Sequence, residues 1–597
     1  MSTNREVLTD FHHLKVAAVA VGSAALTACG GGGGGADPHA TNANGDASAG
    51  TTAVDPTPPT ASQQEDAARF LAQAALSATP AAVSDLATKI SRSTTAYTDW
   101  LDAQFKMAPG PALWDAAVAF KFYDVADVGG DNGMDNLLWW RLFTAQDELR
   151  QRVVLALSEL FVVSVRNMGV PWGQFNCLAY WDMLEQHCFG TFRDLVEAVT
   201  LSPAMGAYLS MRGSQKAGGQ DGSDVGRRPD ENYARELMQL FTIGLVHLDL
   251  AGRPIAGQGD TYNNDDVTNL AKALTGWDFV GTVDYAKPTD SLAYTRLAMQ
   301  PNELLHDTSV KTVLGQSIPA SQDARTDLKG ALDIICSHPN VAPFIARQLI
   351  QRLVSSNPEP AHIQNVATVF NASGGDMKAV ITAVLTDPLA RAPLTGDQAL
   401  RRCKLREPLL RFIQWGRMVG LTSTLSYVNG GIQAPAGTTV THPLTVLDWW
   451  NIGDLSAASR LAQSPLRSPS VFNFFRPGYV PLNSGLSADG FVAPEFQITD
   501  ESSVIGYANF MRQHIAGAPD QFMAVDYSHW LALAADASQL VDNLNLLLTG
   551  RALAPITIEV IVGAVGSLDG SNQTALRNRV MMAFYLMLVS PDYMVQR

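Results

Sequence analysis

The chain has 597 residues, of which 46% are hydrophobic and 17% are charged. This composition is typical of a folded globular protein and excludes a chain that is disordered throughout. Acidic residues number 57 and basic residues 42, which gives a formal net charge of −15. Because the sequence also lacks any long run of basic residues, we expect no nucleic-acid partner.

The N-terminal segment, residues 1–28, is typical of a signal peptide. His12, His13 and Lys15 precede an apolar run over residues 16–26, which leads directly into Thr27-Ala28-Cys29. A transmembrane helix needs ~20 mostly apolar residues, so this run is too short to span a bilayer. Small residues after a short apolar core instead indicate a cleavage site, and we predict that residues 1–28 are removed.

Cys29 is the predicted lipid attachment site. Leu26-Thr27-Ala28-Cys29 resembles the lipobox of bacterial lipoproteins, and this resemblance implies that Cys29 becomes the mature N-terminus and carries palmitate and other acyl chains. Several acyl chains hold a protein stably on a membrane. We therefore expect a location in the cell envelope, at the outer membrane or its periplasmic face rather than in the cytoplasm. An ordinary signal peptide with an incidental cysteine is the alternative.

The rest of the chain divides by composition at about residue 62. Residues 29–62 consist mainly of Gly, Ala, Thr, Asn and Pro, which indicates a flexible tether. From residue 63 to residue 597, apolar residues recur with the spacing of amphipathic helices, and we predict a mainly α, multi-helix domain with long irregular loops. The clearest predicted helices cover residues 67–76, 137–143, 148–165, 180–186, 192–201, 232–245, 266–274, 342–353, 363–370 and 377–386.

Common catalytic and metal-binding motifs are absent from the sequence. It contains no G-x-S-x-G elbow, H-E-x-x-H, Walker A loop, C-x-x-C pair or EF-hand loop. We therefore predict no metal site, and the sequence names no cofactor. Cys177 and Cys188, if on one helix, lie too far apart for a disulfide, since eleven residues rise ~16 Å.

The segment over residues 227–244 places polar side chains within an apolar helical pattern. Asn232 and Glu236 lie one turn apart on a face shared with apolar residues, which predicts partial burial. Glu231 and Arg235 form a second pair with the spacing of a helical ion pair. A buried carboxylate requires a partner such as a cation or a metal, so Glu236 is a candidate site residue. A carboxylate at a helix N-terminus beside a surface ion pair is the alternative reading.

The stretch Asp230-Glu231-Asn232-Tyr233-Ala234-Arg235-Glu236-Leu237 resembles the signature of the bacterial family catalogued as domain of unknown function 1800. Further landmarks follow in the family's order at residues 155–164, 201–205, 274–277, 305–311, 338–340, 406–408, 468–479, 493–496 and 590–593. The resemblance implies one continuous domain from about residue 65 to the end. It implies no reaction, but such genes often neighbour genes for exported proteins similar to sulfatases and alkaline phosphatases, which suggests a partner of that kind.

A second candidate constellation lies at residues 305–311. His306, Asp307 and Lys311 offer an imidazole, a carboxylate and an ammonium group that could converge with Glu236. Local capping by His306 and a turn at Asp307 are the alternative. In this hypothesis Glu236, His306 and Lys311 are catalytic, while Asn232, Arg235 and Asp307 bind the ligand.

Two functions follow from these patterns. In the first, the chain is a helical scaffold or binding lipoprotein that holds an exported partner or a ligand at the cell envelope. In the second, it is an envelope-anchored hydrolase that acts on a polymer or glycan through Glu236 and His306. The absence of a catalytic motif favours the first. Convergence of Glu236, His306 and Lys311 on an open pocket would favour the second.

Overall fold

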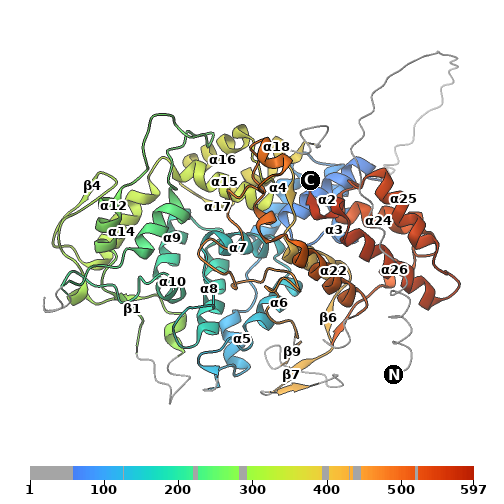
Figure 1. Ribbon diagram of the computed structural model, residues 1–597, viewed down its shortest axis with the longest axis horizontal. Helices are drawn as coiled ribbons and strands as arrows, with labels where there is room; N and C mark the ends of the chain where they lie inside the picture. Colours follow the sequence, from blue (N-terminus) through green and yellow to red (C-terminus); the bar gives the residue numbers. More distant parts are fainter. Residues whose placement is uncertain are drawn as a thin grey trace, which may run out of the picture. The chain divides into compact units, whose positions relative to one another are not determined.

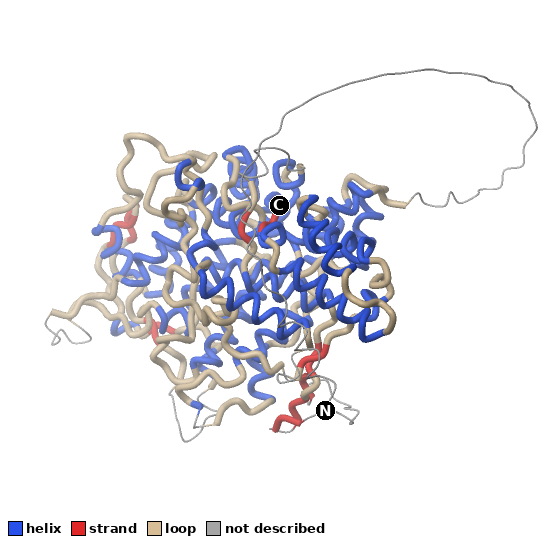
Figure 2. Tube along the Cα trace, turned by 45° about the vertical axis from the view of Figure 1, so that its right-hand side comes forward, coloured by secondary structure: helices blue, strands red, loops and turns tan. Residues whose placement is uncertain are grey.

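The computed structural model describes residues 58–597 except 125–126, 219–225, 282–291, 393–401, 429–430, 434–445, 449 and 518–521. Residues 58–597 form one compact unit. This unit is mainly helical, as predicted, and its strands are short (Figures 1 and 2). Cys29, the predicted signal peptide and almost all of the predicted tether lie outside the described residues.

The first and last helices of the described chain pack together (Figure 1). Thr60 caps the first of them through a reciprocal capping box with Gln63, which satisfies backbone groups that a helix start leaves without partners. This group comprises α2 (Ala61–Ala74), α3 (Pro80–Ile90), α24 (Ala537–Thr549), α25 (Pro555–Gly566) and α26 (Gln573–Leu588). α24 contacts α2, α25 and α26, so it joins the two ends of the chain.

A second group of helices includes α7 (Glu148–Leu160), which is almost wholly buried. The other members are α5 (Leu113–Ala119), α6 (Met134–Thr144), α8 (Gly173–His187), α20 (Pro408–Met418) and α22 (Glu501–Ile515). Every residue of α7 after Glu148 is buried, including Arg152 and Glu159. A helix surrounded by protein leaves its charged side chains no access to water, so they need partners within the core.

A third group follows α8 in the chain: α9 (Phe192–Leu201), α10 (Pro203–Tyr208), α12 (Asn264–Ala273), α14 (Ala324–Cys336), α15 (Val341–Leu353), α16 (Pro360–Ser373) and α17 (Met377–Thr386). α15, α16 and α17 contact one another, while α9 packs between α8 and α14. Shorter α-helices are α4 (Ala96–Phe105), α18 (Pro388–Arg391), α21 (Gly485–Ala488), α23 (Ser528–Leu531) and α27 (Pro591–Met594). Three 3-10 helices span Ala293–Thr295, Glu303–Leu305 and Pro494–Ile498.

The strands pair antiparallel in small sheets. β1 (Trp277–Asp278) pairs with β2 (Gln300–Pro301), β3 (Lys311–Val313) with β4 (Gln316–Ile318), β5 (Lys404–Leu405) with β11 (Val595–Gln596), and β6 (Thr422–Ser423) with β10 (Met523–Ala524). β7 (Ser426–Val428) lies between β8 (Gly431–Gln433) and β9 (Val446–Asp448). The β5–β11 pair places the C-terminal strand beside Lys404, which belongs to a buried cluster described below.

Several details differ from the predictions. The helix expected over residues 148–165 ends at Leu160. The helix expected over residues 266–274 begins two residues earlier, at Asn264, and is capped by Asn263, with Asp266 completing a capping box. The prediction for the two cysteines, in contrast, is confirmed: Cys177 and Cys188 are buried free thiols and are not paired with each other. Within the described ranges, no helix is both long enough and apolar enough to cross a membrane.

Candidate functional site

The predicted signature helix forms but is shorter than expected. α11 spans Asn232–Glu236 and passes directly into a π-helical turn over Leu237–Thr242. Thr242 Oγ1 donates a hydrogen bond of 2.5 Å to the carbonyl oxygen of Leu237 within this turn. Because a π turn holds more residues than an α turn, the helical spacing predicted for residues 232–245 does not continue past Glu236.

Asn232 and Glu236 do not share a buried face. Asn232 is exposed, which corrects the prediction of partial burial, because it stands at the open N-terminal end of a helix of only five residues. Glu236 is half-buried, and its Oε2 is buried without a hydrogen-bond partner. Burial raises the pKa of Glu236, and nearby Arg235 opposes this rise. The predicted Glu231–Arg235 ion pair is confirmed at 3.4 Å and is partly exposed.

His306 and Lys311 meet at a carboxylate that the sequence did not single out. His306 Nε2 lies 3.0 Å from Asp327 Oδ2, and Lys311 Nζ lies 2.5 Å from the same oxygen. All three side chains are 0% exposed. His306 Nδ1 also lies 3.0 Å from the carbonyl oxygen of Thr275. Asp327 comes from α14, Lys311 from β3 and His306 from the loop before β3, so the cluster joins these three segments.

We term His306, Lys311 and Asp327 the histidine–lysine cluster, and Asp307 lies at its edge. Its Oδ1 lies 3.8 Å from Lys311 Nζ, and its carboxylate accepts hydrogen bonds from Ser309. Burial tends to raise the pKa of Asp307, but the Ser309 hydrogen bonds and Lys311 outweigh it and lower that pKa. In the described part of the chain, no hydrogen bond or ion pair joins Glu236 to His306 or Lys311. The expected convergence with Glu236 is therefore not seen, and the cluster is closed by its own ion pairs.

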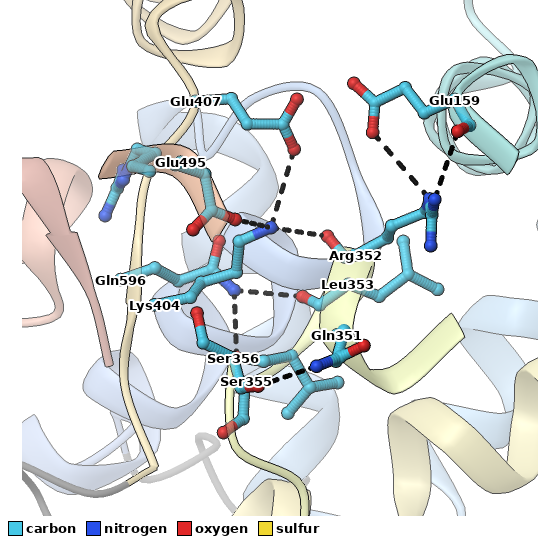
Figure 3. Close-up of polar contacts among 12 residues, drawn as sticks. Glu159, Gln351, Arg352, Leu353, Ser355, Ser356, Lys404, Glu407, Glu495 and Gln596 are labelled. Carbon is cyan, nitrogen blue, oxygen red and sulfur yellow. Dashed lines mark hydrogen bonds and ion pairs between the residues drawn. The ribbon is translucent and has the colours of Figure 1, made fainter. Parts of the chain in front are cut away.

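A second buried cluster contains three glutamates and was not predicted. We term it the carboxylate cluster: it consists of Arg152, Glu159, Arg352, Lys404, Glu407, Gln463 and Glu495. Figure 3 shows Glu159, Arg352, Lys404, Glu407 and Glu495 of this cluster. Lys404 Nζ lies 3.4 Å from Glu407 Oε1 and 3.2 Å from Glu495 Oε1. It also donates a hydrogen bond of 2.9 Å to the carbonyl oxygen of Arg352. Lys404 thus forms ion pairs with two carboxylates from different segments of the chain.

Glu159 and Glu407 are bridged by an amide. Gln463 Nε2 donates to Glu159 Oε1 at 3.2 Å and to Glu407 Oε2 at 2.8 Å. Burial and the neighbouring Glu407 carboxylate raise the pKa of Glu159 well above its usual range. Burial acts the same way on Glu407, but Lys404, a hydrogen bond from Glu159 and Arg152 outweigh it and hold its pKa at about 2. Glu159 therefore keeps its proton while Glu407 is ionised.

The carboxylate cluster borders a cavity too small for a substrate. The cavity has a volume of about 20 Å³ and is lined by Glu159, Ser464 and Asn473 among others. Ser464 Oγ and Asn473 Nδ2 are buried without hydrogen-bond partners in the structure. A polar cavity of this size has room for about one water molecule. Lys404 and two arginines face the three carboxyl groups, so the cluster has no surplus of negative charge.

The sequence contained a signal for this cluster that was used only to recognise the family. Glu159 stands in the apolar stretch Leu157-Ser158-Glu159-Leu160-Phe161, where a charge can be buried only with partners. The family landmarks at residues 155–164, 406–408 and 493–496 each supply one of the three glutamates. What the sequence could not indicate is that these stretches meet, since residues 159 and 463 are 304 positions apart.

An open groove is the third feature, and we term it the acidic groove. It has a volume of about 670 Å³ and is lined by α5, α8, α9, α10 and the residue 295–298 segment. Its charged or titratable lining residues are Asp115, Asp182, His187, Asp194, Glu197 and Arg296. Four carboxyl groups thus face a single arginine. A further hollow, of about 590 Å³, has balanced charges, because Asp102 and Asp376 face Lys106 and Lys378.

Asp182 forms the buried side of the acidic groove. α5 has no side-chain cap of its own, and Asp182 accepts hydrogen bonds from its first two backbone N–H groups, those of Leu113 and Trp114, at 2.8 and 2.9 Å. These bonds and the helix N-terminus favour the ionised carboxylate. Burial has the larger effect and raises the pKa of Asp182 to about 6.

The outer carboxylates of the acidic groove differ in how they are paired. Arg296 lies 2.7 Å from Asp115, and its guanidinium sits 3.9 Å above the Trp114 ring. Glu197 lies 2.7 Å from Arg193. Asp194, in the first turn of α9, has no side-chain hydrogen bond or ion pair among the described residues. The groove therefore presents surplus negative charge to solvent.

Potential metal ligands do not form a metal site in the described ranges. No group of three or more His, Cys, Asp or Glu side chains there has a geometry suited to a metal ion. Among the acidic residues of this region, Asp260 pairs with Val246 in an isolated β-bridge, while Asp265 and Asp266 lie in the first turn of α12. No cofactor site is defined by the residues described.

The protein is thus mainly helical, its histidine–lysine cluster and carboxylate cluster are buried, and its acidic groove is open to solvent. The family described as "Protein of unknown function (DUF1800)" matches residues 69–595, and the chain belongs to this family. No curated protein and no solved structure matches the chain.

Proposed function

We propose that the protein is an exported lipoprotein, anchored through Cys29, whose helical body binds a basic peptide segment of an exported partner in the acidic groove. The observation that carries this proposal is the charge of the groove: it is open and acidic, whereas both buried clusters are neutralised by their own cations. A surplus of like charge on an open surface favours a partner of opposite charge. A partner similar to sulfatases or phosphatases, suggested by the family resemblance, is one source of such a segment.

The alternative, a hydrolase using Glu236 and His306, has weaker support. A general base has to reach the proton that it removes, directly or through one water. His306 and Lys311 are 0% exposed and occupied by Asp327, and no hydrogen bond or ion pair among the described residues joins Glu236 to either. The proposed roles of Asn232, Arg235 and Asp307 in ligand binding stay predictions.

α9 supplies the most accessible part of the proposed binding site. Asp194 and Glu197 are three residues apart on this helix and both line the groove, so their carboxylates stand on one face. A lysine or arginine side chain entering the groove can pair with Asp194 without displacing an existing partner. At Glu197 it would share the carboxylate with Arg193.

Tetralysine is a suitable probe, with binding measured by calorimetry at low ionic strength. Exposed ion pairs contribute ~0.2–1 kcal/mol each, so Asp194→Asn with Glu197→Gln should weaken binding roughly two- to thirtyfold. The matched control is Asp85→Asn with Asp99→Asn, which removes the same charge from exposed sites on α3 and α4. Equal affinities for the two double variants would contradict the groove as the binding site.

The anchor is tested separately. Cells that express the protein should incorporate labelled palmitate into it, and Cys29→Ala should abolish the label. Label that persists in the variant would show that the lipid is attached elsewhere.

A further inference from the structure

α25 exposes apolar side chains on its outer face. Ile556 and Val560 are each 61% exposed and stand one helical turn apart. Ile561 and Val565 are the buried residues of this helix, and the helix packs against α24 and α26. Gly563 continues the outer face and has open space beside it. We term the outer strip formed by Ile556, Val560 and Gly563 the α25 face. Glu559 lies beside this strip.

This face lies close to the point where the chain enters the folded body. Glu65, in the first turns of α2, lies 3.8 Å from Arg551, and a Cβ atom at Gly550 would be in van der Waals contact with the Glu65 carbonyl oxygen. α25 begins only four residues after Arg551, at Pro555. Four residues span at most about 14 Å. α2, α24 and α25 accordingly lie side by side (Figure 1).

The proposed anchor brings a membrane to the same region. Between Cys29 and α2 the sequence contains residues 29–60, the segment predicted to be a tether. A Gly-rich tether of that length separates its ends by about 30 Å on average. The start of α2, and with it the α25 face, would therefore stay near the lipid surface at high local concentration.

We propose that the α25 face rests on the lipid surface when the protein is anchored, an inference that depends on the proposed anchor at Cys29. Aliphatic side chains leave water when they enter the boundary between headgroups and acyl chains. Two aliphatic side chains are too few to hold a protein on a membrane by themselves. In a protein that the lipid at Cys29 already anchors, they need only to orient the folded body. Since the protein is acidic overall and Glu559 flanks the face, an uncharged phosphatidylcholine surface suits it better than an anionic one.

A depth-sensitive label tests the contact in the lipidated full protein. Val560→Cys carries an environment-sensitive fluorophore, with Cys336 and Cys403 replaced by serine and Cys177 and Cys188 left buried. The matched control is Ile505→Cys on α22, where Ile505 is 62% exposed. Both proteins are bound to phosphatidylcholine vesicles, with and without brominated acyl chains.

Bromine should quench the label at position 560 at least twofold and leave the label at position 505 unchanged. Ile556→Asp should abolish that quenching while the protein still floats with the vesicles through its lipid. Equal quenching at the two positions, or none at 560 in a protein that carries palmitate and floats, would overturn the α25 contact and leave the anchor intact. Absence of palmitate from the wild-type protein would overturn the anchor, and the α25 contact with it.

Discussion

The carboxylate cluster and the acidic groove are both rich in acidic residues, yet they differ in their cations. In the cluster, Lys404 and two arginines face three glutamates, and one glutamate keeps its proton. In the groove, four carboxyl groups face one arginine and open to solvent. Buried charge has to be neutralised within the protein, whereas exposed charge is stabilised by water and stays available to a partner.

The comparison indicates different roles for the two regions. The cluster connects α7, α15, β5, the start of α20 and the 3-10 helix at Pro494–Ile498. Removing one charge there should therefore affect folding. Removing one charge from the groove should affect binding alone. The following predictions separate these effects, beginning with the largest.

Lys404→Met should give the greatest loss of stability. It leaves Glu407 and Glu495 buried without their shared cation, and breaking a buried pair typically costs about 3–5 kcal/mol. Urea unfolding measures the change, and Lys378→Met, at an exposed position on α17, is the control that should stay within about 0.5 kcal/mol. A loss below about 1 kcal/mol for Lys404→Met would show that the cluster does not hold its segments together. Tetralysine binding should be unchanged in any folded fraction.

Lys311→Met in the histidine–lysine cluster should cost less, about 2–3 kcal/mol. Asp327 loses its lysine but keeps His306 Nε2 at 3.0 Å, so one of its two buried partners remains. Adding His306→Leu to the same variant removes the second partner and should lower the free energy of unfolding further. Urea unfolding measures both proteins. Equal free energies for the single and the double variant would contradict the support of Asp327 by His306.

The two glutamates bridged by Gln463 should respond differently to the same substitution. Glu407 has a pKa of about 2 and is ionised at neutral pH, so Glu407→Gln breaks an ion pair and should cost about 2–4 kcal/mol. Burial and Glu407 keep Glu159 protonated, so Glu159→Gln replaces one neutral group by another and should cost less than about 1 kcal/mol. Each variant is the control for the other. If Glu159→Gln were the more damaging, the assignment of the proton would be wrong.

The smallest effect is a pH dependence of binding in the groove. The pKa of Asp182 is raised to about 6 by burial, so the carboxyl group is negative above that pH and neutral below it. Tetralysine should therefore bind about two- to fivefold more weakly at pH 5 than at pH 7, the equivalent of one weak ion pair. Both proteins in this test carry His187→Gln, because an imidazole in the groove also gains positive charge on acidification. Asp182→Asn should remove the difference, and a dependence that survives would assign it to another group.

Local features of the site were predictable, and distant ones were not. The Glu231–Arg235 pair follows from a spacing of four residues, and the structure confirms it. The π turn after Glu236 depends on packing against other helices, so the sequence period did not reveal it. Asp327 was missed because it looks like an ordinary polar residue of an amphipathic helix until β3 places Lys311 against it.

The sequence by itself determined the helical class, the positions of some helices and the family, because apolar periodicity and short motifs are properties of neighbouring residues. The anchor at Cys29 stays a prediction. Only the tertiary structure decided which charged side chains are buried in ion pairs and which are exposed to solvent. Glu159 and Gln463 are 304 positions apart in the sequence but form a hydrogen bond, and the groove is lined by helices from separate parts of the sequence. Burial and the pairing of charges depend on those long-range contacts, and so does the choice of the groove over His306 as the candidate site.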